Sequence, residues 1–152
     1  MPGFSIGVTV LAPPARVFGI AADIPRINSI IPSITRVEVL TPGPTRVGTR
    51  WRETRKAGPG SATVELEVTA FDPDRLMTVV GTMAGTRYTS TFAFQPVPDG
   101  TRVSLDCSAT PTTFLACLMV PLTMLMLPTM SKDMEGDLKA LKAAAEKPGQ
   151  DA

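Results

Sequence analysis

Alternating apolar and polar residues indicate half-buried β-strands along most of the chain. The predicted strands are 4–11, 35–39, 46–56 and 61–71, followed by three more that are separated by turns at 72–75, 84–85 and 97–100. Two short helices are predicted between the first two strands, at 15–22 and 24–31. Prolines open the first of these helices and end the second, which fits their boundaries.

The lengths of the turns fix how the strands of this meander pair with one another. A four-residue loop at 57–60 places Trp51 opposite Leu66 and Glu53 opposite Val64. The pairs predicted across the three later turns are Ala70–Met77, Val68–Val79, Leu66–Gly81, Gly81–Tyr88, Val79–Ser90, Met77–Phe92, Phe94–Val103, Phe92–Leu105 and Ser90–Cys107. A slip of one residue in any pair would turn charged side chains to the inside, which supports these registers.

The registers agree on one inward face, which is almost wholly apolar. It consists of Trp51, Glu53, Val64, Leu66, Val68, Ala70, Met77, Val79, Gly81, Tyr88, Ser90, Phe92, Phe94, Val103, Leu105 and Cys107, with Thr49 and Arg55 nearer the strand ends. The opposite face of strand 46–56 carries Arg50, Arg52 and Lys56. Two glutamates of the next strand lie opposite these residues, so we expect cross-strand ion pairs rather than a phosphate-binding patch.

A long helix is predicted at 112–147, and its second half is amphipathic. Its first half, 114–130, is apolar almost all round but too short to span a bilayer, and Pro121 and Pro128 interrupt it with a kink or a short break. A buried core helix is the favoured interpretation of 114–130. A lip that contacts a membrane and an interface between two copies of the chain are the alternatives.

Composition excludes several classes of chemistry. The chain has no histidine, so Ser-His and Cys-His nucleophile pairs, histidine bases and histidine metal sites are excluded. We expect Cys107 and Cys117 to be buried, inert thiols. Fifteen basic and 14 acidic residues give a net charge of +1, which argues against a nucleic-acid partner. We expect no metal and no cofactor, and an intracellular, cytoplasmic protein, because no signal-peptide pattern is present.

Several short motifs, in this order, resemble one superfamily. They are Ala12–Phe18 leading to Ala22-Asp23, Ile31–Ile34 leading to Val37–Val39, Val47–Trp51, Phe71–Leu76, and Asp137-Leu138 followed by Leu141-Lys142. The chain resembles the START-like group (SRPBCC), which includes polyketide cyclases and birch-pollen-allergen-like proteins. The resemblance implies an α+β helix-grip fold, in which a curved antiparallel sheet of about seven strands wraps around the C-terminal helix. It implies a single domain at 1–147, and we expect 148–152 to be a disordered tail.

The resemblance also implies a cavity between the sheet and the last helix that holds a hydrophobic ligand. Together with the apolar inward face and the missing histidine, it favours a non-enzymatic protein that binds or transports a lipid, acyl chain or polyketide. The residues predicted to contact the ligand are Trp51, Glu53, Leu66, Val68, Met77, Val79, Tyr88, Ser90, Phe92, Phe114, Leu118 and Leu122. The alternative is a polyketide cyclase, aromatase or dehydratase, with Glu53 as acid/base and Tyr88 positioning a carbonyl.

Each polar candidate on the inward face also has a structural interpretation. Glu53 in an apolar wall needs either a raised pKa or a basic partner, and Arg55 on the same face is the candidate partner. We favour a structural pair at the cavity mouth over a catalytic carboxylate. Tyr88 and Ser90 fit equally well a hydrogen bond to a ligand and one within the protein.

Overall fold

The computed structural model describes residues 3–57 and 59–147, so the predicted tail at 148–152 lies outside the described residues. Seven antiparallel strands form one sheet in the order β1-β7-β6-β5-β4-β3-β2. The strands are β1 (Gly3–Val10), β2 (Ile34–Val39), β3 (Arg50–Ala57), β4 (Gly60–Asp72), β5 (Leu76–Met83), β6 (Thr86–Val97) and β7 (Gly100–Pro111). The helices are α1 (Pro14–Ala21), the 3-10 turn η1 (Ile24–Arg26), α2 (Ile27–Ile30), α3 (Phe114–Leu118) and α4 (Val120–Glu146).

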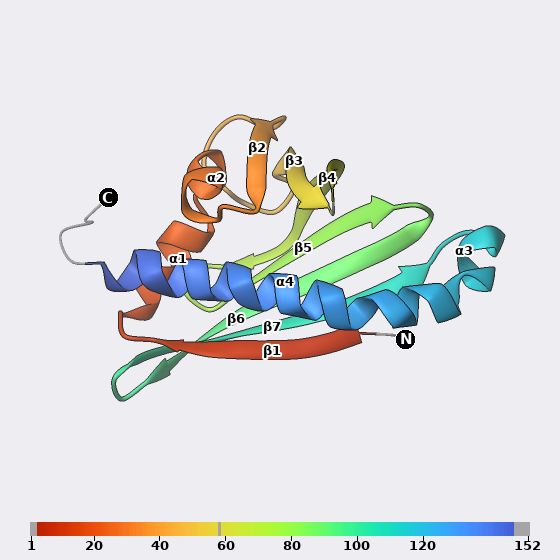
Figure 1. The fold of residues 1–152 in the computed structure, drawn as a ribbon. Helices are drawn as coiled ribbons and strands as arrows, with labels where there is room; N and C mark the ends of the chain where they lie inside the picture. Colours follow the sequence, from red (N-terminus) through yellow and green to blue (C-terminus); the bar gives the residue numbers. More distant parts are fainter. Residues whose placement is uncertain (1–2, 58, 148–152) are drawn as a thin grey trace.

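Figure 1 shows α4 lying along one face of the sheet, closest to β1, while α1 and α2 cover one end of the same face. The predicted α+β class, with seven antiparallel strands and a long C-terminal helix, is therefore confirmed. The predicted pairs of β3 with β4, of β5 with β6 and of β6 with β7 are all present. Turn length was sufficient to set these registers, and for β3 and β4 the outward glutamates and arginines also form the expected ion pairs.

The pair predicted between Ala70 and Met77 is wrong. The register shifts between Val68 and Ala70, so that Ala70 pairs with Thr78 and Phe71 pairs with Met77. This β-bulge turns the Phe71 ring inward, where its centroid lies 5.3 Å from that of Phe18 in an edge-on contact. Ala70, predicted to face inward, lies on the outer face instead.

The predicted boundaries differ at two turns. The strand expected from residue 46 begins at Arg50, because the chain turns first through Gly48, whose φ of +94° suits glycine. The helix expected from residue 112 is broken at Met119, before the proline at position 121, which lies in the first turn of α4. At Pro128, where a kink or a short break was predicted, α4 is not broken, since the helix continues through that residue.

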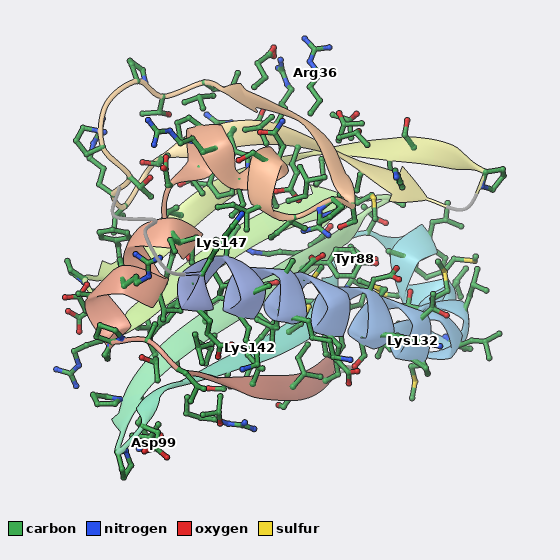
Figure 2. All side chains as sticks on the ribbon, turned by 60° about the vertical axis from the view of Figure 1, so that its left-hand side comes forward. Arg36, Tyr88, Asp99, Lys132, Lys142 and Lys147 are labelled. Atoms are coloured by element: carbon green, nitrogen blue, oxygen red, sulfur yellow. The ribbon has the colours of Figure 1, made fainter. Side chains whose placement is uncertain are left out.

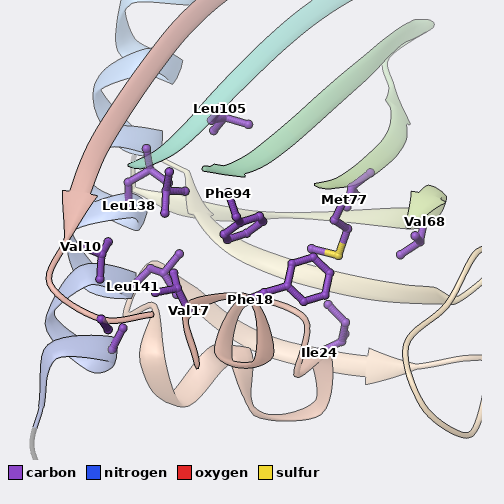
Figure 3. Close-up of a cluster of buried hydrophobic side chains, with 14 of the residues drawn as sticks. Val10, Val17, Phe18, Ile24, Val68, Met77, Phe94, Leu105, Leu138 and Leu141 are labelled. Atoms are coloured by element: carbon purple, nitrogen blue, oxygen red, sulfur yellow. The ribbon is translucent and has the colours of Figure 1, made fainter. Parts of the chain in front are cut away.

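The hydrophobic core lies where α1 and the second half of α4 meet the sheet (Figure 3). Phe18 of α1 stacks edge-on against Phe71 and Phe94, and Leu138 and Leu141 of α4 are buried in the same cluster. The other members include Val10, Val17, Val68, Met77, Val103, Leu105 and Ala145. This packing closes one end of the inward face.

Leu105 tests this core directly, because its side chain is only 1% exposed. Replacing Leu105 by Ala leaves a cavity and is expected to lower the free energy of unfolding by about 2–5 kcal/mol in urea denaturation. The matched control is Leu11→Ala, since Leu11 is 61% exposed, and its expected change is within about 0.5 kcal/mol. Equal losses in the two variants would contradict the assignment of the core.

Candidate functional site

The two ends of the inward face differ in how completely the protein covers them. At the end covered by α1, Phe94, Val103 and Leu105 are fully buried. Farther from α1, several inward side chains of β4 and β6 keep partial contact with solvent, although Cys107 and Ala109 on the same face are buried. We call this set the half-buried end; it consists of Val64, Leu66, Tyr88, Ser90 and Phe92.

The path of α4 explains this difference. The helix lies against β1 and α1, and its buried residues all come from its second half. The first half of α4 directs Leu122 and Leu125 to solvent. Leu138 and Leu141 shield the core from solvent, but the side chains of β4 and β6 at the half-buried end are not shielded by α4 in the same way.

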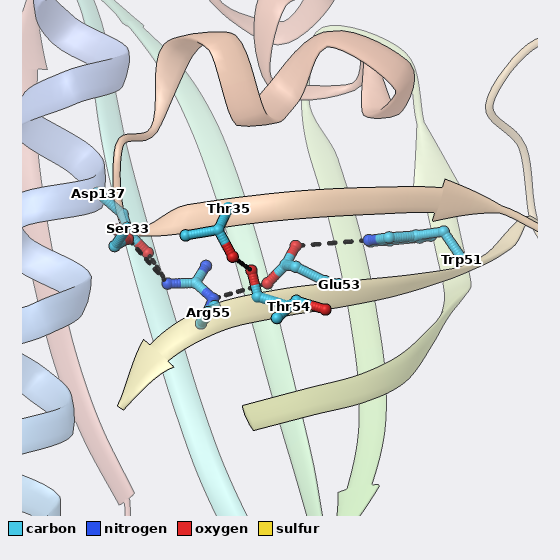
Figure 4. Close-up of polar contacts among 7 residues, drawn as sticks. All are labelled: Ser33, Thr35, Trp51, Glu53, Thr54, Arg55 and Asp137. Carbon is cyan, nitrogen blue, oxygen red and sulfur yellow. Dashed lines mark hydrogen bonds and ion pairs between the residues drawn. The ribbon is translucent and has the colours of Figure 1, made fainter. Parts of the chain in front are cut away.

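A network of charged side chains joins the sheet to α4 (Figure 4). The Arg55 guanidinium donates from Nε to Glu53 Oε2 at 2.6 Å and from Nη1 to Asp137 Oδ2 at 2.7 Å. The Ser33 hydroxyl donates to Asp137 Oδ1 at 2.9 Å, and the Trp51 indole N–H donates to Glu53 Oε1 at 3.4 Å. The Glu53 and Asp137 side chains are only 8% and 11% exposed, so these charges are paired away from bulk water.

The electrostatics of this network favour a charged arginine. Burial by itself lowers the pKa of Arg55, but the carboxylates of Glu53 and Asp137 outweigh it and raise the pKa above its ordinary value. The predicted pairing of Glu53 with Arg55 is confirmed, whereas Asp137 and Ser33 were missed as its partners. The position of Asp137 four residues before Leu141 places it on the inner side of α4, but its pairing with Arg55 could not be found without the tertiary structure.

The half-buried end contains two polar groups that the network does not use, the hydroxyls of Tyr88 (Figure 2) and Ser90. The Tyr88 hydroxyl has no hydrogen-bond partner among residues 3–57 and 59–147, whereas Ser90 donates to Cys107 Sγ at 3.7 Å. Burial raises the pKa of Tyr88, and the neighbouring Cys107 adds to this effect. Burial likewise raises the pKa of the Cys107 thiol, so both groups are neutral near pH 7. Cys117, predicted to be buried, is exposed.

The predicted ligand-contacting residues fall into three groups. Those that are buried are Trp51, Glu53, Val68, Met77 and Val79, those at the half-buried end are Leu66, Tyr88, Ser90 and Phe92, and those that are mostly exposed are Phe114, Leu118 and Leu122. The structure therefore brings the strand residues to one face but does not bury the helix residues with them. The favoured interpretation of 114–130 as a buried core helix is wrong, because most of its large apolar side chains face solvent.

The structure has two open concavities, and none of the five residues of the half-buried end lines either of them. One, of about 510 Å³, is lined mainly by outward polar residues of β1, β6 and β7, including Thr91 and Asp106. The other, of about 350 Å³, lies between α1 and the loop at 43–45. A ligand cavity between sheet and helix stays a prediction. Among the described residues, no helix has the length and apolarity needed to cross a bilayer.

Comparisons with known proteins identify related folds. The profile of the family described as polyketide cyclase / dehydrase and lipid transport matches residues 1–146. Among solved structures, TTHA0849 from Thermus thermophilus is 23% identical, with a TM-score of 0.75 over 95% of this chain and 97% of that one. The Zhui aromatase/cyclase from Streptomyces sp. R1128 is 17% identical, with a TM-score of 0.76 over 95% of this chain and 93% of that one.

A third structure, the di-domain ARO/CYC StfQ of the steffimycin biosynthetic pathway, is 15% identical with a TM-score of 0.77. The match covers 95% of this chain and 50% of StfQ, so this chain corresponds to about half of that protein. A search of curated proteins finds no significant match. At these identities the structural likeness establishes the helix-grip fold and does not transfer an activity.

The charged network predicts a large cost for losing Arg55. An Arg55→Met variant leaves the Glu53 and Asp137 carboxylates buried without their cation, and we expect its free energy of unfolding to fall by about 3–5 kcal/mol. Arg50→Met is the matched control on the same strand, since its ion pairs with Glu65 and Glu67 are exposed and are expected to contribute at most about 1 kcal/mol. Chemical denaturation measures both, and a similar small loss in the two variants would show that the network is not structural.

Tyr88 is the single tyrosine, so tyrosinate absorbance follows it alone. In the folded protein its titration midpoint is expected above the ordinary value of about 10, and in denaturant near that value. The pKa of Tyr88 is higher in the folded state than in the unfolded state, so the neutral phenol contributes to the free energy of unfolding. This contribution is complete at pH values below the pKa of the unfolded state. It is lost as pH rises through the folded pKa. Coinciding midpoints in the folded and denatured states would contradict burial of the phenol.

Proposed function

Because the chain belongs to the polyketide cyclase/dehydrase and lipid transport family, we propose that it binds a hydrophobic small molecule against the half-buried end, between the sheet and α4. One observation carries this proposal. Leu66 and Phe92 keep apolar surface in partial contact with water. Two residues further along the same strands, Val68 and Phe94 are buried. A ligand placed there would complete the cover that α4 gives the other end.

The energetics of such a complex rest mainly on apolar contact. Each Å² of apolar surface removed from water contributes roughly 25 cal/mol before the costs of association are subtracted. Met134 of α4 packs against the core cluster and is only partly buried, and its flexible side chain can adapt to ligands of different shape. The site would therefore select by size and apolarity more than by a specific pattern of polar groups.

Tyr88 is the group that we propose to orient the ligand. Its hydroxyl lies on an otherwise apolar wall, is neutral near pH 7 and lacks a described partner, so it can donate a hydrogen bond to a carbonyl or hydroxyl oxygen. Ser90 is less suited to this role, because it already donates to Cys107. A lipid, acyl chain or polyketide carries an oxygen of the required kind.

The alternative is a polyketide cyclase, aromatase or dehydratase in which Glu53 acts as acid/base. It is favoured by the position of Glu53 and Tyr88 on the same face of the sheet. We prefer binding without catalysis, because both oxygens of Glu53 already accept hydrogen bonds, from Arg55 and Trp51. If Glu53 accepted a proton as a general base, it would lose the negative charge that pairs with Arg55, which opposes that role.

The orienting role of Tyr88 is tested by matched ligands. A medium-chain methyl ketone and the alkane of equal length are compared by displacement of a fluorescent apolar probe from the wild type and from Tyr88→Phe. Loss of one hydrogen bond is expected to weaken ketone binding about 2- to 12-fold and to leave alkane binding unchanged. Equal effects on both ligands, or none on either, would exclude Tyr88 as the orienting group.

The Glu53→Gln variant distinguishes a ligand carrier from an enzyme, because the two hypotheses predict different effects on ligand affinity and on turnover. A carrier is expected to keep its ligand affinity within about threefold, because Gln retains an acceptor for Arg55, whereas an enzyme would lose about 10²–10⁴ in turnover of a poly-β-ketone substrate. Native mass spectrometry of protein from its own host, with extraction of co-purified molecules, supplies the ligand for this assay. Turnover by wild type that Glu53→Gln abolishes would replace our proposal with the cyclase.

A further inference from the structure

One end of the molecule exposes a concentration of large apolar side chains. We call it the apolar tip; it consists of Met83 at the β5–β6 turn together with Phe114, Leu115, Leu118, Met119, Leu122, Met124, Leu125 and Met126. Each of these residues is between 41% and 80% exposed. Figure 1 shows α3 and the start of α4 at this end, and the backbone bond from Thr112 N to Gly85 O, at 2.8 Å, joins the turn to α3.

This surface is larger than a monomeric protein usually leaves in water. Aromatic side chains bury about 150–250 Å² each and Leu and Met somewhat less, so the nine partly exposed side chains of the apolar tip present on the order of 800 Å². The largest apolar patch of a soluble monomer is typically about 300–600 Å². The excess indicates that something covers the apolar tip when the protein functions.

The shape of the apolar tip favours a deformable partner over a flat one. Met124, Leu125 and Met126 follow one another at about 100° intervals around α4, and all three are exposed. A flat protein surface contacts only one side of a helix. The headgroup and acyl region of a bilayer can surround a helix that enters it, and so can contact all three of these side chains. Seven residues after Leu125, the same outer face carries Lys132 (Figure 2), so the apolar character ends within about two turns.

The charges at this end complement an anionic surface. The stretch 107–131 contains no Asp, Glu, Lys or Arg, and the only charged residue of β5 and β6 is Arg87, which is exposed next to the turn. Lys56, also exposed, lies at the neighbouring β3–β4 hairpin, which points to the same end of the sheet. Arg87 and Lys56 are therefore placed to approach lipid phosphates, and the stretch 107–131, β5 and β6 carry no carboxylate to oppose them.

We propose that the apolar tip docks on the surface of a phospholipid bilayer that contains anionic lipids. The side chains of α3 and of the first turns of α4 enter the interface, and Arg87 and Lys56 lie over the headgroups. The second half of α4 stays packed on the core through Leu138 and Leu141, so the chain lies on the membrane without unfolding. This inference goes beyond the proposed ligand site and does not require it.

Cys117 provides a reporter inside the apolar tip. It is exposed, whereas Cys107 is buried, so a thiol-reactive environment-sensitive fluorophore labels α3 selectively. With vesicles of phosphatidylcholine and phosphatidylglycerol, we expect co-sedimentation of the protein and a blue shift of the fluorophore. Vesicles of phosphatidylcholine alone should bind more weakly, because the contribution of Arg87 and Lys56 is then lost.

Substitutions within and outside the apolar tip test whether this surface makes the contact with the vesicle. Leu115→Asp combined with Leu125→Asp is expected to reduce vesicle binding at least about tenfold, because both charges would enter the interface. Val47→Asp is the matched control, since Val47 is 58% exposed and lies in the loop before β3, outside the apolar tip, and its binding should not change. Circular dichroism verifies that both proteins are folded, and displacement of the apolar probe verifies that the ligand site is unaffected.

Three results would overturn the proposal. The first is a wild type that does not bind vesicles of either composition. The second is equal vesicle binding by the double variant and Val47→Asp. The third is a dimer in sedimentation equilibrium that the double variant dissociates while vesicles leave the wild-type dimer intact, which would assign the apolar tip to a second copy of the chain.

Discussion

The structure depends on how the inward, apolar face of the sheet is covered, because α1 and the second half of α4 pack against one end of it. Phe18 of α1 and Leu138 and Leu141 of α4 seal one end of this face against Phe94 and Leu105. The paired charges of Arg55 and Asp137 then fix α4 relative to β3. Because the remaining length of α4 carries no comparable inward contacts with β4–β6, the other end of the face is left half buried. The ligand site that we propose is a consequence of this uneven cover.

The division of α4 into two halves has a second consequence. Its second half presents an apolar stripe inward and charged residues such as Lys139 outward, as a helix on a soluble core does. The first half presents Leu122 and Leu125 outward, so the same helix exposes apolar surface at one end of the molecule. Ligand binding and membrane docking would use adjacent surfaces, the first on the inner side of α4 and the second around its start.

Much of the fold could be predicted from the sequence, because apolar residues alternate with polar or charged ones along most strands. Arg50 and Arg52 cannot turn inward without large cost, which fixes β3 against β4. The bulge near Ala70 could not be predicted, because Ala70 and Phe71 are both apolar and either satisfies the alternation. The Glu53–Arg55 pair follows from spacing on one strand, whereas Asp137 is 82 residues from Arg55 and needed the tertiary structure. The exposure of 114–126 was missed because apolar composition alone does not distinguish a core helix from a docking surface.

The most direct test of the central claim is to locate a bound apolar molecule by isotope-filtered NOEs between an unlabelled ligand and the ¹³C-labelled protein. We expect contacts to Val64, Leu66 and Phe92 and none to Val103 or Leu105, which are fully buried in the core. Contacts confined to the outer face of the sheet, or the absence of any saturable contact at the half-buried end, would contradict it.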